Sequence, residues 1–199
     1  MQDFNSDNPT PYSYWVIKNR LLAGEYPGQQ NPGNPIRSFF SKFYALLATI
    51  NRPDKGWHNV QVRCEELINS GINSFVDLTE EGELPEYYSF ITQLASEEGV
   101  TVHYTRMPIP DRKIPTISYL TKILDYIDNE LANKRNVYVH CFRGLGRTGT
   151  IIGSHLARHG KTGEEALAEI FNLRQGVLNS WWPSPQTEEQ RKMVFNWKE

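Results

Sequence analysis

The sequence predicts an α/β fold with a largely parallel sheet that helices cover on both faces. Short apolar segments alternate with segments of helical periodicity through the second half of the chain, and this alternation is typical of parallel sheets. Two short β-type segments around Lys18 and Asn19 add a hairpin at one edge of the sheet. A glycine-bearing loop follows the last predicted strand, which predicts a site at the carboxyl end of a central strand.

Each element follows from the pattern of apolar residues and turn formers. We expect a flexible arm over residues 1–14 and one domain over residues 15–199. The hairpin strands are 15–17 and 20–23, and a loop rich in proline, glycine and asparagine spans 26–35. The later elements are expected at residues 36–50 (a helix with an aromatic stripe), 59–70 (helix), 74–78 (strand), 87–95 (helix), 100–104 (strand), 117–131 (helix), 137–139 (strand), 147 onwards (helix) and 164–174 (helix).

Composition indicates one ordinary globular domain. The chain has 199 residues, of which 39% are hydrophobic and 22% charged, and its formal net charge is −2. Such a charge gives no general attraction to nucleic acid or to an anionic membrane. No apolar run is long enough for a transmembrane helix, and the polar start, without lysine or arginine, is unlike a secretory signal. Two cysteines do not make a disulfide framework, so we expect a reducing, cytoplasmic setting. We also expect a monomer.

A cysteine stands at the junction of a predicted strand and a predicted helix. Residues 140–149 read His-Cys-Phe-Arg-Gly-Leu-Gly-Arg-Thr-Gly. The loop and the helix N-terminus gather backbone N–H groups around the thiol, which makes an anion site. The positive surroundings also favour the nucleophilic thiolate, and Arg147 can place two N–H donors on an oxyanion. This combination predicts transfer of a phosphoryl group to the sulfur of Cys141.

The segment His-Cys-x5-Arg-Thr resembles the signature loop of the cysteine-dependent protein tyrosine phosphatase superfamily, and most of all its compact, dual-specificity-like bacterial members. The resemblance implies an α/β phosphatase domain that hydrolyses phosphomonoesters through a cysteinyl-phosphate intermediate, without a metal or another cofactor. Cys141 would attack phosphorus while the loop holds the phosphate. The phosphate-binding residues that the resemblance implies are Phe142, Arg143, Gly144, Leu145, Gly146 and Arg147.

The family also carries an aspartate that protonates the leaving oxygen from a mobile loop, about 30 residues before the cysteine in its small members. Here the proline-bounded loop 108–115 contains one acid, Asp111, which lies 30 positions before Cys141. A dianionic phosphoryl group nearby would favour the protonated carboxyl. Asp77 is the second candidate, because it also lies near the carboxyl end of a strand, although its sequence favours hydrogen bonding to the following turn.

Three further roles rest on the same resemblance. Gln186 precedes a helix start, as in the glutamine-bearing loop that positions the attacking water in classical tyrosine phosphatases, and Gln190 is the second choice for this role. The capping pattern Thr187-x-x-Gln190 marks that helix start. Thr148 would stabilise the thiolate when it leaves in the second step. His140 would act from behind the loop, on its geometry and on the ionisation of the thiol.

The expected substrate is a phosphorylated protein or a small phosphoester. A phosphoinositide or inositol-phosphate phosphatase would use the same chemistry, but its loop often carries additional lysines, whereas here only Arg143 is basic among the variable positions. A non-catalytic module that binds phosphorylated residues is the alternative from another class, and such modules typically lose the cysteine, the arginine or the acid. The preference between phosphotyrosine and phosphoserine or phosphothreonine stays open.

Two other features do not predict a site. His155 and His159 lie on one helical face, but the sequence offers no third ligand beside them. We therefore expect no metal there, and interpret the imidazoles as complements to the carboxyl end of the helix. Cys64 falls on a predicted helix and not beside the loop, so a role as a resolving thiol is the lesser interpretation.

Overall fold

A five-stranded sheet forms the centre of the computed structural model, which describes residues 7–28 and 55–198. The strand order is β1-β2-β5-β3-β4. Strands β1 (Ser13–Ile17) and β2 (Leu21–Glu25) form an antiparallel hairpin at one edge. Strands β5 (Val137–Cys141), β3 (Ser74–Asp77) and β4 (His103–Arg106) continue the sheet in parallel with β2. The predicted α/β class and its edge hairpin are therefore confirmed.

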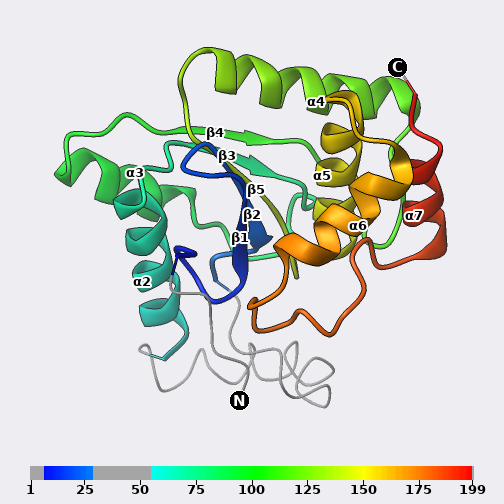
Figure 1. The fold of residues 1–199 in the computed structure, drawn as a ribbon. Coiled ribbons are helices and arrows are strands. Elements are labelled where there is room, and N and C mark those ends of the chain that lie inside the picture. Colours follow the sequence, from blue (N-terminus) through cyan, green and yellow to red (C-terminus); the bar gives the residue numbers. More distant parts are fainter. Residues whose placement is uncertain (1–6, 29–54, 199) are drawn as a thin grey trace.

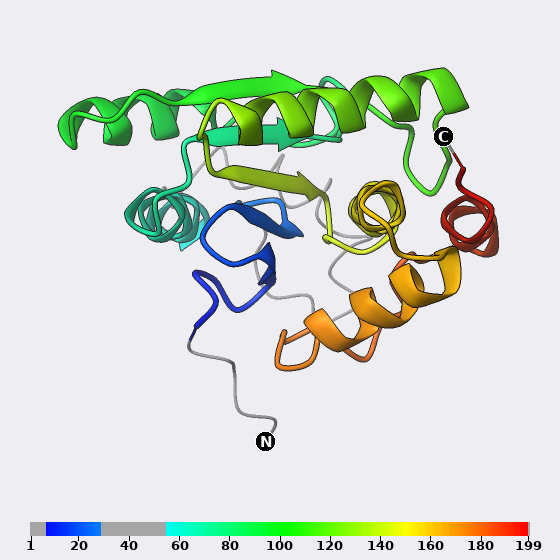
Figure 2. The same cartoon turned by 45° about the horizontal axis from the view of Figure 1, so that its top comes forward.

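Helices cover both faces of this sheet (Figures 1 and 2). On one face lie α2 (Lys55–Asn69) and α3 (Tyr88–Glu97). The other face carries α4 (Ile117–Ala132), α5 (Gly146–Arg158), α6 (Gly163–Leu173) and α7 (Glu188–Phe195). Because side chains alternate along a strand, neighbouring residues such as Val139 and Tyr138 enter the two different apolar clusters. Cys141, the last residue of β5, belongs to the cluster under α4 and α5.

Sequence patterns placed most of the described elements within a few residues of their observed bounds. Thr116 caps α4 by accepting from Tyr119 N, and Thr162 forms a capping box with Glu165. The strand predicted at 100–104 instead begins at His103, because α3 closes with Gly99 at a φ of +68° and Val100 N donates to Ala95 O. The helix predicted at 36–50 lies outside the described residues.

The prediction of a flexible arm is wrong for residues 7–14. Asn8, Thr10 and Tyr12 are buried, and Leu178 N donates to Pro11 O from the far end of the sequence. Tyr14 is buried in the main apolar cluster as part of β1. These contacts fasten the segment to the domain. Within the described residues, no helix has the length and hydropathy needed to cross a lipid bilayer.

Candidate active site

The predicted cysteine loop connects the central strand β5 to the N-terminus of α5. Cys141 is the last residue of a fully buried strand, and Gly146 begins the helix. The N-cap, Leu145, provides no side-chain acceptor, so the first amides of α5 stay available to an anion. Gly144 has a φ of +66°, and a Cβ there would lie 2.5 Å from the carbonyl carbon of Gly24 in the neighbouring strand. Only glycine lets the loop approach β2 this closely.

Donors from outside hold the carbonyl groups of the loop. Asn179 Nδ2 donates to Arg143 O at 3.2 Å, and Ser184 Oγ donates to Leu145 O at 2.9 Å. Asn179 is held in turn by Arg174, whose Nη2 donates to both its Oδ1 and its backbone oxygen. Because these carbonyl groups point toward the outside donors, the N–H groups of the loop can point toward its centre, where an anion would bind. The sequence did not indicate this bracing from residues 174–184.

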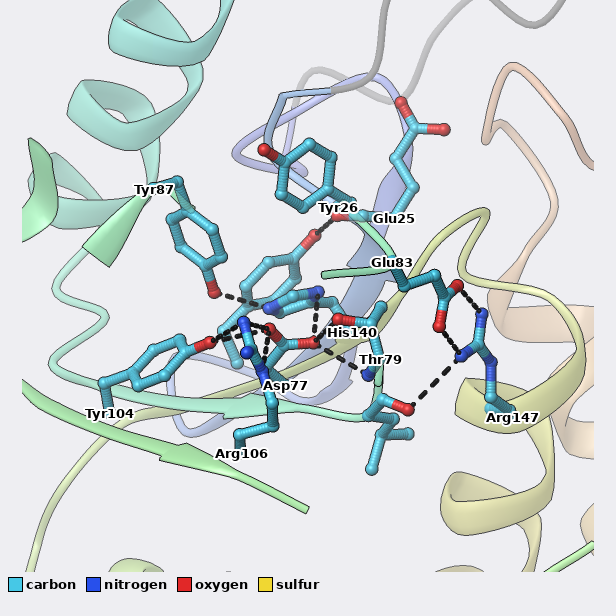
Figure 3. Close-up of polar contacts among 12 residues, drawn as sticks. Glu25, Tyr26, Asp77, Thr79, Glu83, Tyr87, Tyr104, Arg106, His140 and Arg147 are labelled. Atoms are coloured by element: carbon cyan, nitrogen blue, oxygen red, sulfur yellow. Dashed lines mark hydrogen bonds and ion pairs between the residues drawn. The ribbon is translucent and has the colours of Figure 1, made fainter. Parts of the chain in front are cut away.

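Arg147 is buried beside the loop and lies at the centre of a charged cluster. Its Nη1 and Nη2 donate to the two carboxylate oxygens of Glu83 at 2.7 and 2.6 Å (Figure 3). Nη1 also donates to Ile109 O at 3.1 Å. Burial lowers the pKa of Arg147, but the hydrogen bonds to Glu83 and the nearby Cys141 and Asp111 outweigh burial, so its pKa is raised. The guanidinium is therefore firmly held and charged.

Sequence reasoning missed Glu83. It lies in the loop that follows β3, at the carboxyl edge of the sheet where the site was expected. The loop holds several acids, Glu80, Glu81, Glu83 and Glu86, and no spacing rule separates the one that faces Arg147 from the exposed ones. The proximity depends on the conformation of the loop, which only the structure provides.

Replacement of Glu83 by glutamine is expected to lower kcat by about 10- to 100-fold. A less firmly held Arg147 would no longer keep the oxygens of the transferred phosphoryl group in the reactive geometry. Binding of inorganic phosphate should be at least as tight, since a negative charge has been removed beside the anion site. Steady-state kinetics with phosphate inhibition would measure both effects. Glu81→Gln, in the same loop but exposed, is the control and should behave as wild type; equal kinetics for both variants would argue against this role.

The structure brings Asp111 to the same arginine. Its Oδ1 lies 3.2 Å from Nη2 of Arg147, and its side chain is 59% exposed. The loop between β4 and α4 that carries it is tied down on both sides of the aspartate, because Ile109 N donates to Leu78 O and Lys113 O accepts from Gln190 Nε2. Asp111 is thus held beside Arg147 with most of its side chain exposed.

Asp77, the second candidate for the acid, is committed to a buried network. Its carboxylate accepts from the backbone and hydroxyl of Thr79, from Tyr104 and from Arg106 (Figure 3). Burial raises the pKa of Asp77, but nearby His140 and the hydrogen bonds from Tyr104 and Thr79 more than compensate, so its pKa is lowered. A buried carboxylate with these donors is held ionised, which does not suit a proton donor.

His140 lies directly behind the cysteine and is fully buried. One ring nitrogen, Nε2, contacts the hydroxyl of Tyr87, and the other faces Asp77 at 3.9 Å (Figure 3). Burial lowers the pKa of His140, although the nearby Asp77 opposes the shift. Tyr87, which the sequence placed only in a helix, therefore orients the histidine that precedes Cys141.

The remaining predicted side chains have different surroundings. Thr148 is buried in the first turn of α5, and its hydroxyl has no hydrogen-bond partner among the described residues. Gln186 is half-buried before α7, and its backbone oxygen accepts from Arg191. Gln190 is fully buried: its Oε1 accepts from Thr187 N in a capping box, and its Nε2 holds the Asp111 loop at Lys113 O. The suggestion that Gln190 positions water is thus disfavoured, because both ends of its amide are used.

Cys64 lies apart from this site. It is buried in α2 within the apolar cluster on the opposite face of the sheet from α5. Burial raises the pKa of the Cys64 thiol to about 12. A neutral thiol packed in that cluster does not suit the role of a resolving partner for Cys141.

Glu25, at the end of β2, is paired in register with Cys141. Burial raises the pKa of Glu25 to about 8, although its ion pair with Arg63 opposes the shift. Because this pKa exceeds the ordinary value of 4.5, protonation of Glu25 stabilises the folded state relative to the unfolded state. This stabilisation is complete below about pH 4.5 and is lost as the pH rises through about 8.

The variant Glu25→Gln keeps an acceptor for Arg63 but removes the titration. We expect the wild type to lose up to a few kcal/mol of unfolding free energy, relative to this variant, between pH 5 and pH 8.5. Urea unfolding of both proteins at the two pH values would measure the difference. Parallel pH profiles for the two proteins would contradict the expectation.

Comparisons with known proteins agree with this geometry. Residues 51–161 match the family model described as "Polymorphic toxin system, DSP-PTPase phosphatase". The chain therefore belongs to this family, and with it to the compact dual-specificity-like members of the cysteine-dependent protein tyrosine phosphatase superfamily.

Curated relatives match parts of this chain. Cyclin-dependent kinase inhibitor 3 from Rattus norvegicus is 34% identical over 91 residues, which are 45% of this chain and 42% of that protein. The tyrosine-protein phosphatase cdcA from Emericella nidulans is 26% identical over 92% of this chain, but over only 30% of its own length. The chain thus spans less than half of the length of these relatives.

Two solved structures share the fold. The active form of Tk-PTP superposes with a TM-score of 0.64 at 22% identity, covering 92% of this chain and 94% of that chain. A kinase associated phosphatase whose catalytic cysteine is replaced by serine superposes with a TM-score of 0.60 at 21% identity, covering 92% and 90%. These likenesses confirm the architecture that the strand and helix pattern predicted.

Proposed function

We propose that this chain is a cysteine-dependent phosphatase that hydrolyses phosphomonoesters of a phosphorylated protein through a cysteinyl-phosphate intermediate. The observation that carries the proposal is the convergence of three parts: Cys141 at the end of the central strand, the uncapped N-terminus of α5 behind the loop, and Arg147 held between Glu83 and Asp111. Membership of the phosphatase family supports the same reaction class.

In the first step, the thiolate of Cys141 attacks phosphorus and the bond from phosphorus to the leaving oxygen breaks. The amides of residues 142–147 bind the equatorial oxygens, and Asp111 gives its proton to the departing oxygen. In the second step, water attacks phosphorus, its proton goes to Asp111, and the sulfur–phosphorus bond breaks. Gln186 orients this water, and the hydroxyl of Thr148 donates to the leaving thiolate. His140, held by Tyr87, keeps the start of the loop in place.

The contacts of Arg147 indicate which of its edges binds the substrate. The Nη1–Nη2 edge is used by Glu83, so the oxyanion would be bound by the Nε–Nη2 edge, which keeps the two-point geometry of an arginine fork. Asp111 contacts Nη2 at 3.2 Å, a position that a phosphate oxygen would take. Substrate binding would therefore release Asp111 toward the leaving oxygen, where its proton is needed.

The loop composition supports a protein or small phosphoester substrate over an inositol phosphate. Phe142 and Leu145 occupy variable positions, and Arg143 is the one basic residue among them. The cysteine, the arginine and the acid are all present, which argues against a module that only binds phosphorylated residues. The two free cysteines and the need for a reduced nucleophile support a cytoplasmic location. We infer a monomer whose chemistry uses no metal or other cofactor.

A substrate panel tests this proposal. Wild-type protein is incubated with an aryl phosphate, phosphotyrosine and phosphoserine peptides, phosphoinositides and inositol phosphates, and the released phosphate is measured. We expect turnover of the aryl phosphate and of at least one class of phosphopeptide, with a higher kcat/KM than for the inositol compounds. A preference for the inositol compounds would favour the same chemistry on another substrate. Binding of phosphopeptides without release of phosphate would favour the non-catalytic module.

A further inference from the structure

Far from the cysteine loop, the two histidines near the end of α5 meet a carboxylate from α4. Oδ1 of Asp128 lies 3.1 Å from Nε2 of His155 and 2.9 Å from Nε2 of His159. One possible ligand atom from each of the three side chains lies within 4.8 Å of the other two. The sequence did not predict this group, because its third member comes from another helix, 27 residues before His155.

Secondary structure fixes this arrangement. His155 and His159 are four residues apart, so they lie one above the other on the same face of the helix, and their ring centroids are 4.4 Å apart. Asp128 reaches this face from α4, which packs beside α5 in the same apolar cluster. The three side chains thus converge from two helices whose positions are already set by apolar packing.

Arg158 orients the carboxylate without covering the atom that faces the histidines. Its Nη1 lies 3.1 Å from Oδ2 of Asp128 and 2.9 Å from Oδ1 of Asp125. Oδ1 of Asp128 stays directed at the two imidazoles. Asp125 balances the charge of Arg158, so the local charge around the carboxylate favours a cation. An outer partner that holds a ligating carboxylate is a regular part of metal sites.

We propose that Asp128, His155 and His159 bind a zinc ion. Two imidazoles and one carboxylate are ligands that Zn²⁺ accepts, with bonds of about 2.0–2.2 Å and one position open to water. At those bond lengths, tetrahedral ligand atoms are about 3.3 Å apart, close to the observed 3.1 and 2.9 Å. Mg²⁺ and Ca²⁺ prefer sets made only of oxygen ligands.

The surroundings give the ion a route to the site. The side chain of His155 is 3% exposed, that of Asp128 30% and that of His159 53%. An ion can enter from the His159 side and be held against the buried ring of His155. Because a helix rises about 1.5 Å per residue, His155 lies about 12 Å along the axis of α5 from Arg147. The ion would join α4 to α5 and stabilise the domain without taking part in the phosphatase chemistry.

Metal binding to protein without a polyhistidine tag tests the proposal. The background is Cys141→Ser, which removes the thiol of the cysteine loop as a competing ligand. After treatment with a chelator and its removal, calorimetry should show one Zn²⁺ bound per chain, and Co²⁺ should give the visible spectrum of a tetrahedral site. At about 100 times Kd, Zn²⁺ should raise Tm by about 5–10 °C. The same concentration of Mg²⁺ should not.

The variants His159→Ala and Asp128→Asn are expected to weaken Zn²⁺ binding by at least about 100-fold, since even an outer partner contributes 10- to 100-fold. His159 is exposed, so its removal leaves the fold intact and keeps the test valid. His103→Ala, on β4, is the matched control and should bind like its parent. Absence of stoichiometric binding in the parent, or equal affinity in His159→Ala, would overturn the proposal. These measurements do not depend on phosphatase activity.

Discussion

Replacement of Cys141 by serine is expected to reduce hydrolysis of an aryl phosphate to the uncatalysed background. A serine hydroxyl is not ionised at neutral pH, so the first step loses its nucleophile. The loop amides and Arg147 are unchanged, and the variant should therefore still bind phosphate and phosphopeptides. Phosphate release and equilibrium binding, measured on the same preparation, would separate the two effects.

Two controls belong with this experiment. Cys64→Ala removes the other thiol, which is buried on the opposite face of the sheet, and should retain wild-type kcat at a temperature where it is folded. A chelator should leave wild-type kcat unchanged at a temperature where the metal-free protein is folded, because no step of the proposed reaction uses a metal. Substantial turnover by Cys141→Ser, or loss of wild-type turnover with the chelator, would contradict the proposed mechanism.

Replacement of Asp111 by asparagine is expected to lower the rate according to how much the leaving group needs a proton. General acid catalysis typically contributes about 10²–10⁴-fold, so an alkyl or phenyl phosphate should lose about that much. An activated aryl phosphate, whose phenolate leaves readily, should lose much less in the first step. A series of aryl phosphates with increasing leaving-group basicity, measured as kcat/KM, would show a steeper dependence in the variant than in the wild type.

The matched variant is Asp77→Asn. This carboxylate accepts from Thr79, Tyr104 and Arg106 in the buried network behind the loop. Its replacement should reduce stability and lower the rate by a similar factor for every leaving group. If Asp77→Asn instead showed the steeper dependence and Asp111→Asn did not, the assignment of the acid would be wrong.

The fold could be predicted because its main signals are local. Apolar periodicity placed the helices, the capping pattern at Thr187 marked the start of the last one, and alternation of strands and helices implied the parallel sheet. The signature loop added the strand-to-helix junction at Cys141. Each of these depends on residues close together in the sequence, which is why they needed no knowledge of tertiary contacts.

The supporting contacts of the site could not be predicted in the same way. Glu83 reaches Arg147 across 64 residues, and Tyr87 reaches His140 across 53. These pairs are set by how the segment after β3 packs against the first turn of α5 and against β5. The sequence of that segment contains several acids and aromatic residues, and it does not show which of them makes each contact. Residues 7–14 were misjudged for a similar reason, because polar composition suggested an arm while Pro11 and Tyr12 pack against distant parts of the chain.

Gln190, in the C-terminal helix α7, helps to position the loop that carries Asp111. Its amide holds the Asp111 loop at Lys113 O, and a Cβ added to Gly146 would lie 2.9 Å from its Oε1. One side chain therefore acts as a spacer between the segment that carries the proposed acid and the helix that begins at the anion site. The distance between Cys141 and Asp111 therefore depends on how α7 packs against the domain. Removal of residues 187–199 would leave the signature loop in place, but it would remove the contact that positions the Asp111 loop relative to it.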